Sequence, residues 1–151
     1  MTASSSIRSA WTTKIWGYPD IVAMTPNIFM YEVLADSQFT VANLYHEAEI
    51  RFFTCKVQRR SEPLPVNQTR YTFSVTIEYY RQQTDVAESV YNDVQDHLET
   101  MDDLVRSQLG KTWNTTVDYY QGAQPIRIDS VRIDGKDCWR GGYVYTAFKT
   151  S

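Results

Sequence analysis

Carboxylates gather on one stretch of the sequence, and their surroundings decide which chemistry they could do. Residues 85–109 hold seven acidic side chains and one base, Arg106, so the stretch carries a net charge of −6. Two carboxylates could act as a general acid and base only in a cleft that shifts their pKa values. A solvated helix face is the simpler interpretation, and a surface that repels DNA or pairs with a basic partner is the third. The acidic residues are Asp85, Glu88, Asp93, Asp96, Glu99, Asp102 and Asp103.

Arginines form a second charged set, nearer the start of the chain. Glu49, Glu62 and Glu78 lie among them, which makes a groove for nucleic acid a poor fit. Ordinary surface charge is the simplest interpretation. The sharper hypothesis is a subunit interface, in which this set pairs with the acidic stretch of a neighbouring copy. Its members are Arg51, Arg59, Arg60, Arg70 and Arg81.

The other reactive residue types form no recognisable site. His46 and His97 have no second His or Cys at the spacing of metal ligands, so we expect structural roles for both. Cys55 and Cys138 are far apart in sequence and are expected to be reduced thiols rather than a disulfide. The sequence holds no GxSxG, Walker or GxGxxG pattern. We therefore expect no catalytic residue, no bound metal and no cofactor.

Length and net charge limit the classes of protein that fit. A chain of 151 residues has the size of one domain and can bury a core without disulfides or metals. Its net charge of −3 gives no overall basic field for nucleic acid or an acidic membrane. The first residues lack an apolar signal region, and the apolar stretch 21–35 is too short to span a bilayer. We expect one domain, residues 1–151, that folds in the cytoplasm.

The elements that position the charged sets centre on residues 70–81. Apolar and polar residues alternate there, which predicts a central strand. The odd-numbered residues from Tyr71 to Tyr79 form its apolar face. A strand over residues 49–60 precedes it. The connection at 61–69 contains two prolines and is expected to be exposed. The two strands are long enough to project as a hairpin around residues 58–70.

A long helix is predicted directly after this strand, over about 85–109, because apolar residues recur there at helical spacing. A short N-terminal helix is expected through Trp16. Asp134-Gly135 is a hairpin turn signal, and Gly141-Gly142 favours a turn or bulge. Further strands are expected at 28–34, 115–120, 126–133 and 142–149. The predicted fold class is α+β: a mixed, mainly antiparallel sheet with the long helix and the short N-terminal helix packed on it.

Three aromatic doublets lie on the predicted strands, at 52–53, 79–80 and 119–120. Adjacent strand residues point to opposite faces, so each doublet puts one ring on each side of the sheet. The long helix can cover one side. The other side is half exposed, covered by the first helix, or covered by another subunit. Tyr80 and Tyr120 therefore join the arginine set as candidate interface residues.

The order of these elements, with five local patterns, resembles the tail terminator (tail completion) proteins of long-tailed bacteriophages. The patterns are IRSAWTTKIW, TPNIFMYEVL, RYTFSVTIEYYR, DVAESVYNDVQDHLETMDDL and DGKDCWRGGYVYTAFKT. The resemblance covers roughly the whole chain. Residues 36–49 and the proline-containing connection are longer than that family leads us to expect.

The resemblance implies a structural, non-enzymatic virion protein that forms a ring, usually hexameric, at the head-proximal end of the tail tube. Such a ring ends tube polymerisation and joins the tail to the head connector or stopper protein. DNA passes through its channel without specific binding, and assembly takes place in the host cytoplasm without a membrane partner. The acidic residues expected at the channel or an interface are Asp93, Asp96, Glu99, Asp102 and Asp103.

Two alternatives remain open at this point. The first is another neck protein, such as a head–tail connector or stopper. The second is a small-ligand-binding or enzymatic α+β domain, with a pocket between the helix and a curved sheet.

Overall fold

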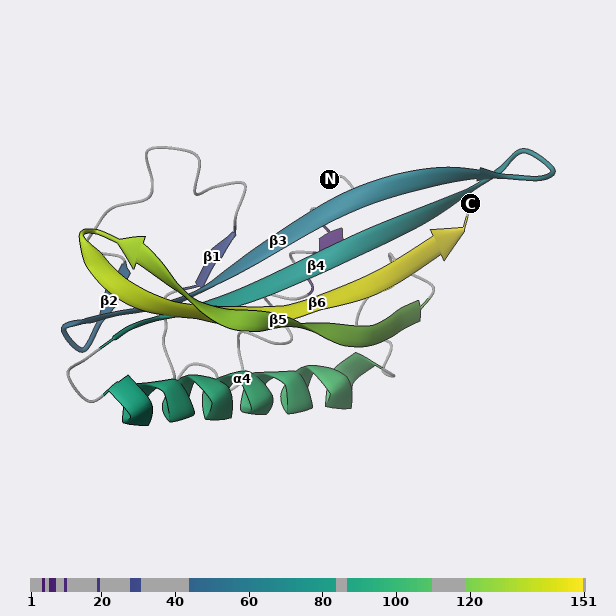
Figure 1. Ribbon diagram of the computed structural model, residues 1–151. Coiled ribbons are helices and arrows are strands. Elements are labelled where there is room, and N and C mark those ends of the chain that lie inside the picture. Colours follow the sequence, from purple (N-terminus) through teal and green to yellow (C-terminus); the bar gives the residue numbers. More distant parts are fainter. Residues whose placement is uncertain are drawn as a thin grey trace.

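A long sheet and one helix make up the described part of the chain (Figure 1). The computed structural model describes residues 28–30, 44–83, 87–109 and 119–150, with isolated positions 4, 6, 7, 10 and 19; at 28–30, 87–89, 108–109 and 119–122 it describes the backbone alone. The elements are β1 (Ile28–Met30), β2 (Tyr45–His46), β3 (Glu49–Leu64), β4 (Gln68–Gln82), α4 (Ala87–Leu109), β5 (Tyr119–Ile133) and β6 (Lys136–Thr150).

The strands lie in the order β1-β3-β4-β6-β5, and β2 pairs separately with β3. The pairs β3–β4, β4–β6 and β5–β6 are antiparallel, while β1 runs parallel to β3 at residues 53–55. β4 has long partners on both sides, so the prediction of a central strand at residues 70–81 is confirmed. The predicted long helix is likewise confirmed, as α4.

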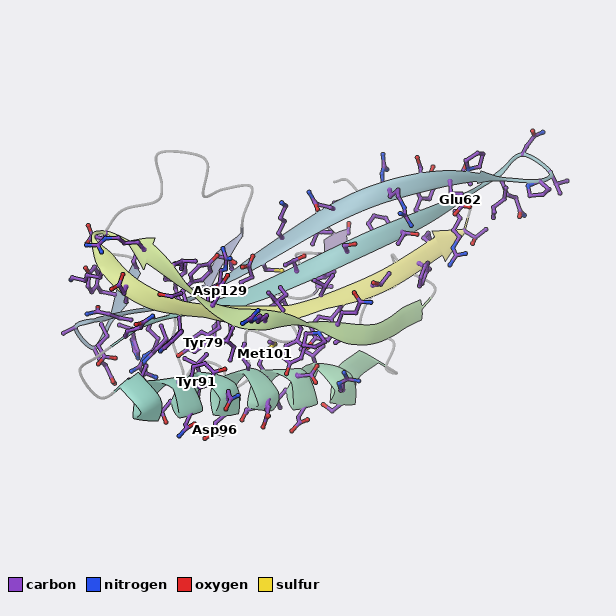
Figure 2. The ribbon with its side chains drawn as sticks, viewed as in Figure 1. Glu62, Tyr79, Tyr91, Asp96, Met101 and Asp129 are labelled. Carbon is purple, nitrogen blue, oxygen red and sulfur yellow. The ribbon has the colours of Figure 1, made fainter. Side chains whose placement is uncertain are left out.

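The core lies between β4, β6 and α4, on the face that alternation predicts. Phe73, Val75, Ile77 and Tyr79 of β4 are at most 1% exposed. Full burial of such a side chain stabilises a fold by about 1.5–3 kcal/mol, so this face is the main source of stability. In Figure 2, Tyr79 and Met101 lie between the sheet and the helix. The helix contributes Val94, Leu98, Met101 and Val105.

The predicted fold class is wrong. Among the described elements, the structure is a mostly antiparallel sheet, 65% strand, with α4 as the single helix, and not a sheet on which a long and a short N-terminal helix pack. Of the residues predicted to form the N-terminal helix, four isolated positions are described, and Ile7 among them is fully buried in the core. The rest of that prediction lies outside the described residues, as do 31–34 and 115–118 of the predicted strands.

The strand content exceeds the prediction because two strands run through residues that looked like breaks. β5 continues past Pro125, which an edge strand tolerates, and shifts register at 121–124 and at 126–129. Each shift leaves two residues of β5 opposite one residue of β6, and such bulges bend and twist a strand. The second bulge faces Gly141, so the bulge expected near the glycine pair is confirmed, although β5 supplies the extra residue.

Gly142 pairs with Glu78 of β4, and the β4 backbone leaves no room for a side chain there. A Cβ atom at this position would lie 1.9 Å from the Ile77 carbonyl oxygen and 2.9 Å from the Glu78 Cα atom. Backbone atoms of a central strand cannot move aside as a flexible side chain can. Gly135 is needed for its backbone conformation. It follows Asp134 in the β5–β6 turn, and the φ angles of Asp134 and Gly135 are 51° and 72°, which confirms the predicted hairpin turn.

We expect Gly142→Ala to lower the free energy of unfolding by about 3 kcal/mol, the upper range for overpacking, because the methyl group would meet the β4 backbone. Gly135→Ala is the matched control: it adds the same methyl group where no atom lies within 4 Å, at a positive φ. Its loss should be near 1 kcal/mol. Urea unfolding of both variants provides the measurement, and equal losses would contradict the close approach.

Candidate assembly surfaces

The hairpin of β3 and β4 extends beyond the part of the sheet that α4 covers (Figure 1). Its strands pair as far as Leu64 and Gln68, and we call residues 58–70 the arm. Every residue from 58 to 63 is exposed, whichever face it points to. At the tip, Val66 is 90% exposed and has a φ of 65°, a conformation rare for a β-branched residue. The arm therefore gains little burial from its own chain.

The backbone of β3 is also exposed along part of the outer edge of this strand. β2 and β1 pair with β3 only at residues 49–50 and 53–55. Along 57–64, none of the described strands pairs with that edge. An unpaired edge offers a row of N–H and C=O groups to a further strand, and proteins usually blunt or cover it.

Two of the five candidate arginines lie inside the subunit. Arg51 and Arg81 face each other on β3 and β4, and their side chains are 12% and 9% exposed. Glu49 lies between them, with a carboxylate oxygen 3.3 Å from Arg51 Nη2 and 3.4 Å from Arg81 Nε. Arg81 also lies 3.9 Å from Asp93 of α4. Arg81 therefore ties the sheet to the helix, and both arginines are internal rather than part of an outer surface.

The other three arginines lie on the arm. The guanidinium of Arg59 lies over the Tyr71 ring, 5.2 Å from its centroid, and that of Arg70 lies 4.4 Å from the Phe148 ring centroid. Cation–π contacts of this kind are worth about 0.5–1 kcal/mol at exposed sites. Strand alternation places Arg60 and Arg70 on the face away from α4, and Arg59 on the face of the helix.

A hollow of about 460 Å³ lies at the base of the arm. Its walls come from β3, β4 and β6, mostly from residues that alternate with the buried core positions. We call it the polar hollow, because hydroxyl, amide and guanidinium groups line it. Its lining residues are Gln58, Arg59, Arg60, Thr72, Ser74 and Thr146.

The five acidic candidates on α4, like the arginines, include both internal residues and exposed ones. Asp93 lies near Arg81, as described, and Asp102 is buried. Asp96, Glu99 and Asp103 are exposed, and Figure 2 shows Asp96 on the side of the helix away from the sheet. Residues three and four apart share a helix face, so these three carboxylates form one row, which we call the acidic stripe.

Asp102 joins the helix to the sheet. Its Oδ1 accepts a hydrogen bond of 2.7 Å from the Tyr145 hydroxyl, and its Oδ2 accepts one of 2.7 Å from Arg106 Nε. Burial of the tyrosine, together with this carboxylate, raises the pKa of Tyr145. A buried carboxylate costs free energy unless both oxygens find partners, and here both do.

Aromatic rings lie on both faces of the sheet, as the doublets predict. On the helix side Phe53 stacks on Tyr79, with centroids 4.5 Å apart, and on the other side Phe52 stacks on Tyr80 at 4.6 Å. Leu44, Ile50 and Cys138 complete a second small core around the latter pair. Burial, followed by the Glu78 charge, raises the pKa of Tyr80 to about 12.

Tyr80 is therefore half-buried within its own subunit, against the segment 44–50. For Tyr120 the structure describes the backbone, which pairs with Ala147, and its side chain lies outside the described part. The doublets at 52–53 and 79–80 are thus explained by two internal cores, and they give no direct support for an aromatic subunit interface.

His97 lies against the core, next to the buried arginines. Its Nδ1 is 3.1 Å from the Tyr79 hydroxyl. Burial, followed by the positive charges of Arg81 and Arg51, lowers the pKa of His97 below its usual value of about 6.5. The ring is consequently neutral in the folded protein at neutral pH, in agreement with the structural role expected for it.

The reactive groups of the described residues are placed for structure. Cys55 and Cys138 are both buried thiols outside any disulfide, in different core clusters, as predicted. Burial raises the pKa of Cys138 to about 11, which keeps it a thiol. Among the described residues, no group of three His, Cys, Asp or Glu side chains is placed to hold a metal ion. None of the described helices is long and apolar enough to cross a membrane.

Comparison with known proteins adds no relative to this picture. No protein-family model matches the sequence, and a search of curated proteins found no match. Functional inference therefore rests on the resemblance of the sequence and on the geometry of the arm, the polar hollow and the acidic stripe.

Sequence reasoning found two of the four uncharged polar members of the hollow and missed the other two. Thr72 and Ser74 were visible as the polar face of the central strand. Gln58 and Thr146 were not, because sequence alone does not reveal which strands flank β4. Gln58 and Thr146 each follow a core residue, Val57 or Tyr145. Strand alternation would therefore have placed them on the polar face once the strand order was known.

The lowered pKa of His97 predicts a dependence of stability on pH. The unfolded chain binds a proton to this residue below about pH 6.5, while the folded protein resists it, so stability should fall as the pH drops below that value. We expect His97→Gln to lose this part of the pH dependence. Urea unfolding at pH 7.5 and 5.5 measures it; an equal change in wild type and variant would contradict the assignment.

Proposed function

We propose that this protein is a structural subunit of the neck of a bacteriophage tail, acting as a tail terminator. In this role it forms a ring on the head-proximal end of the tail tube, ends tube polymerisation and presents a surface to the head connector. The observation that carries the proposal is the arm, whose residues 58–63 are exposed on both faces. Two-stranded hairpins are marginally stable alone, so such an arm fits a protein whose neighbours cover it.

The free edge of β3 supports the same proposal. Residues 57–64 pair with no described strand on their outer side, and closure of a ring is one way in which repeated subunits cover such edges. Capping then follows from geometry: one face of the ring matches the last ring of the tube, and the other face offers no surface for a further tube subunit. The channel passes DNA without specific binding, as the resemblance of the sequence implies.

A second neck role fits the arm equally well. A head–tail connector or stopper would also need an arm that neighbours cover. Its partner distinguishes it, because a terminator binds the end of the tail tube while a connector binds the portal-bearing capsid.

A ligand-binding domain is less well supported. The space between α4 and the sheet is filled by Tyr79, Met101 and Tyr145, each 0% exposed. A hollow of about 240 Å³ beside α4 is lined by residues of α4, β5 and β6, Gln95 and Glu99 among them. A small ligand would have to bind there, at the margin of the core rather than within it.

The test is to mix the purified protein with tail tubes and with portal-bearing capsids, and to measure mass in solution and image by negative staining. We expect rings of several copies, seated on one end of the tubes and not on capsids. Selective binding to capsids would favour the connector role. A monomer at all concentrations that leaves tube ends bare would overturn the proposal.

A further inference from the structure

The polar hollow has the chemistry of a site for carboxylates. Thr72, Ser74 and Thr146 offer hydroxyl groups, Gln58 offers an amide, and Arg60 offers a guanidinium from the arm. Guanidinium groups bind carboxylates through charge-assisted hydrogen bonds, which are about twice as strong as neutral ones. An acidic partner is therefore the complement that this surface fits.

The chain itself carries such a partner surface. Asp96, Glu99 and Asp103 are exposed in one row of α4, and they repel one another because like charges three or four residues apart are unfavourable on a helix. Arg106 does not relieve them, since its Nε donates to the buried Asp102. A cationic surface placed against the stripe would remove this repulsion.

The two surfaces also match in spacing. Glu99 and Asp103 are four residues apart, a rise of about 6 Å along a helix. Gln58 and Arg60 point to the same face of β3, two residues apart, which is about 6.7 Å along a strand. Two neighbouring carboxylates of the stripe can thus meet two neighbouring donor positions of the hollow at once.

The hollow and the stripe lie on opposite sides of the molecule. Apart from Arg59, the side chains of the hollow alternate with core residues such as Val57 and Phe73, so they point away from α4. Asp96 of the stripe lies on the side of α4 away from the sheet (Figure 2), and Glu99 and Asp103 are exposed in the same row. Within one chain the two surfaces cannot meet, and between chains they join head to tail, the heterologous kind of contact that closes rings.

We infer that the acidic stripe of one copy docks in the polar hollow of the next. The inference rests on the proposed ring and names its contact. Arg60 is the cationic group on the face of the hollow, Arg59 is a second positive charge beside it in the lining, and Glu99 and Asp103 are the central anions. This contact assigns the stripe to the interface between subunits rather than to the wall of the channel.

DNA phosphates are the competing occupant of the hollow. Glu62 and Glu78 have the same parity as the hollow residues of their strands, and the chain carries a net charge of −3. A surface that follows a phosphate backbone needs an extended positive groove, and carboxylates along it oppose that. The observations therefore favour a protein partner.

Charge exchange tests the contact. In the arm variant, Arg59→Glu and Arg60→Glu make the hollow acidic; in the helix variant, Glu99→Lys and Asp103→Lys make the stripe basic. All four positions are exposed, so folding should survive, and circular dichroism checks this. Each variant alone should show at least a tenfold weaker self-association by analytical ultracentrifugation at 0.1 M salt. An equimolar mixture should regain it to within threefold, because each acidic arm meets a basic stripe and each basic arm an acidic one.

The matched control is Arg127→Glu with Arg132→Glu, which makes the same change of charge on exposed residues of β5. Self-association of this control should stay within twofold of wild type. If the arm variant, the helix variant and the control all assemble as wild type does, the inference fails while the ring proposal stands. If wild type forms rings and the mixture does not recover, the stripe is not the partner, and the inference is overturned.

Two further outcomes also decide against the contact. A wild-type chain that never self-associates overturns both the contact and the ring. Binding of a duplex DNA fragment that the arm variant loses, with self-association unchanged, would assign the hollow to phosphates instead.

Discussion

The packing of α4 against β4 and β6 is the contact on which the other features of this protein depend. The apolar face of β4, from Phe73 to Tyr79, is almost completely buried, and α4 is the described element that lies across it. Without that helix, the largest apolar surface of the sheet would face water. The position of the helix also determines which of its side chains remain outside, and therefore what the protein offers to a partner.

Asp102 fixes that position. Rotation of the helix by one residue, about 100°, would carry its carboxylate away from Tyr145 and turn a neighbouring side chain into the core. The same hydrogen bonds thus hold Asp102 inside and leave Glu99 and Asp103 outside. Arg81 acts in a similar way near the start of the helix, where it lies between Glu49 and Asp93. Charges that look equivalent in sequence are divided by these contacts into internal ties and an outer surface.

The sequence predicted the elements with strong periodicity. The central strand and the long helix follow from apolar residues at spacings of two and of three to four, and the turn at 134–135 follows from the left-handed preference of Asp-Gly. The fold class was wrong because local breakers were overvalued. Pro125 and the paired glycines 141–142 lie inside long strands, where an edge position, bulges and a close approach of backbones accommodate them.

The candidate surfaces were predictable only in part, for the same physical reason. Pairing between distant strands determines which polar residues lie together on one face of the sheet. Local sequence patterns do not predict that pairing. The arginines illustrate this: Arg51 and Arg81 became internal because Glu49 lies between them, while Arg60 stayed outside on the arm. The sequence predicted correctly which residues of one strand share a face, but it did not predict the contacts between different elements.

The central claim is that the helix-covered sheet is stable alone, whereas the arm is stabilised by a neighbouring copy. Hydrogen exchange of backbone amides, measured by mass spectrometry on dilute and on assembled protein, tests this directly. We expect amides of β4 at 73–79 to be protected in both states, and amides of residues 61–69 to exchange rapidly when dilute and slowly when assembled. Equal protection of 61–69 in the two states would contradict the account.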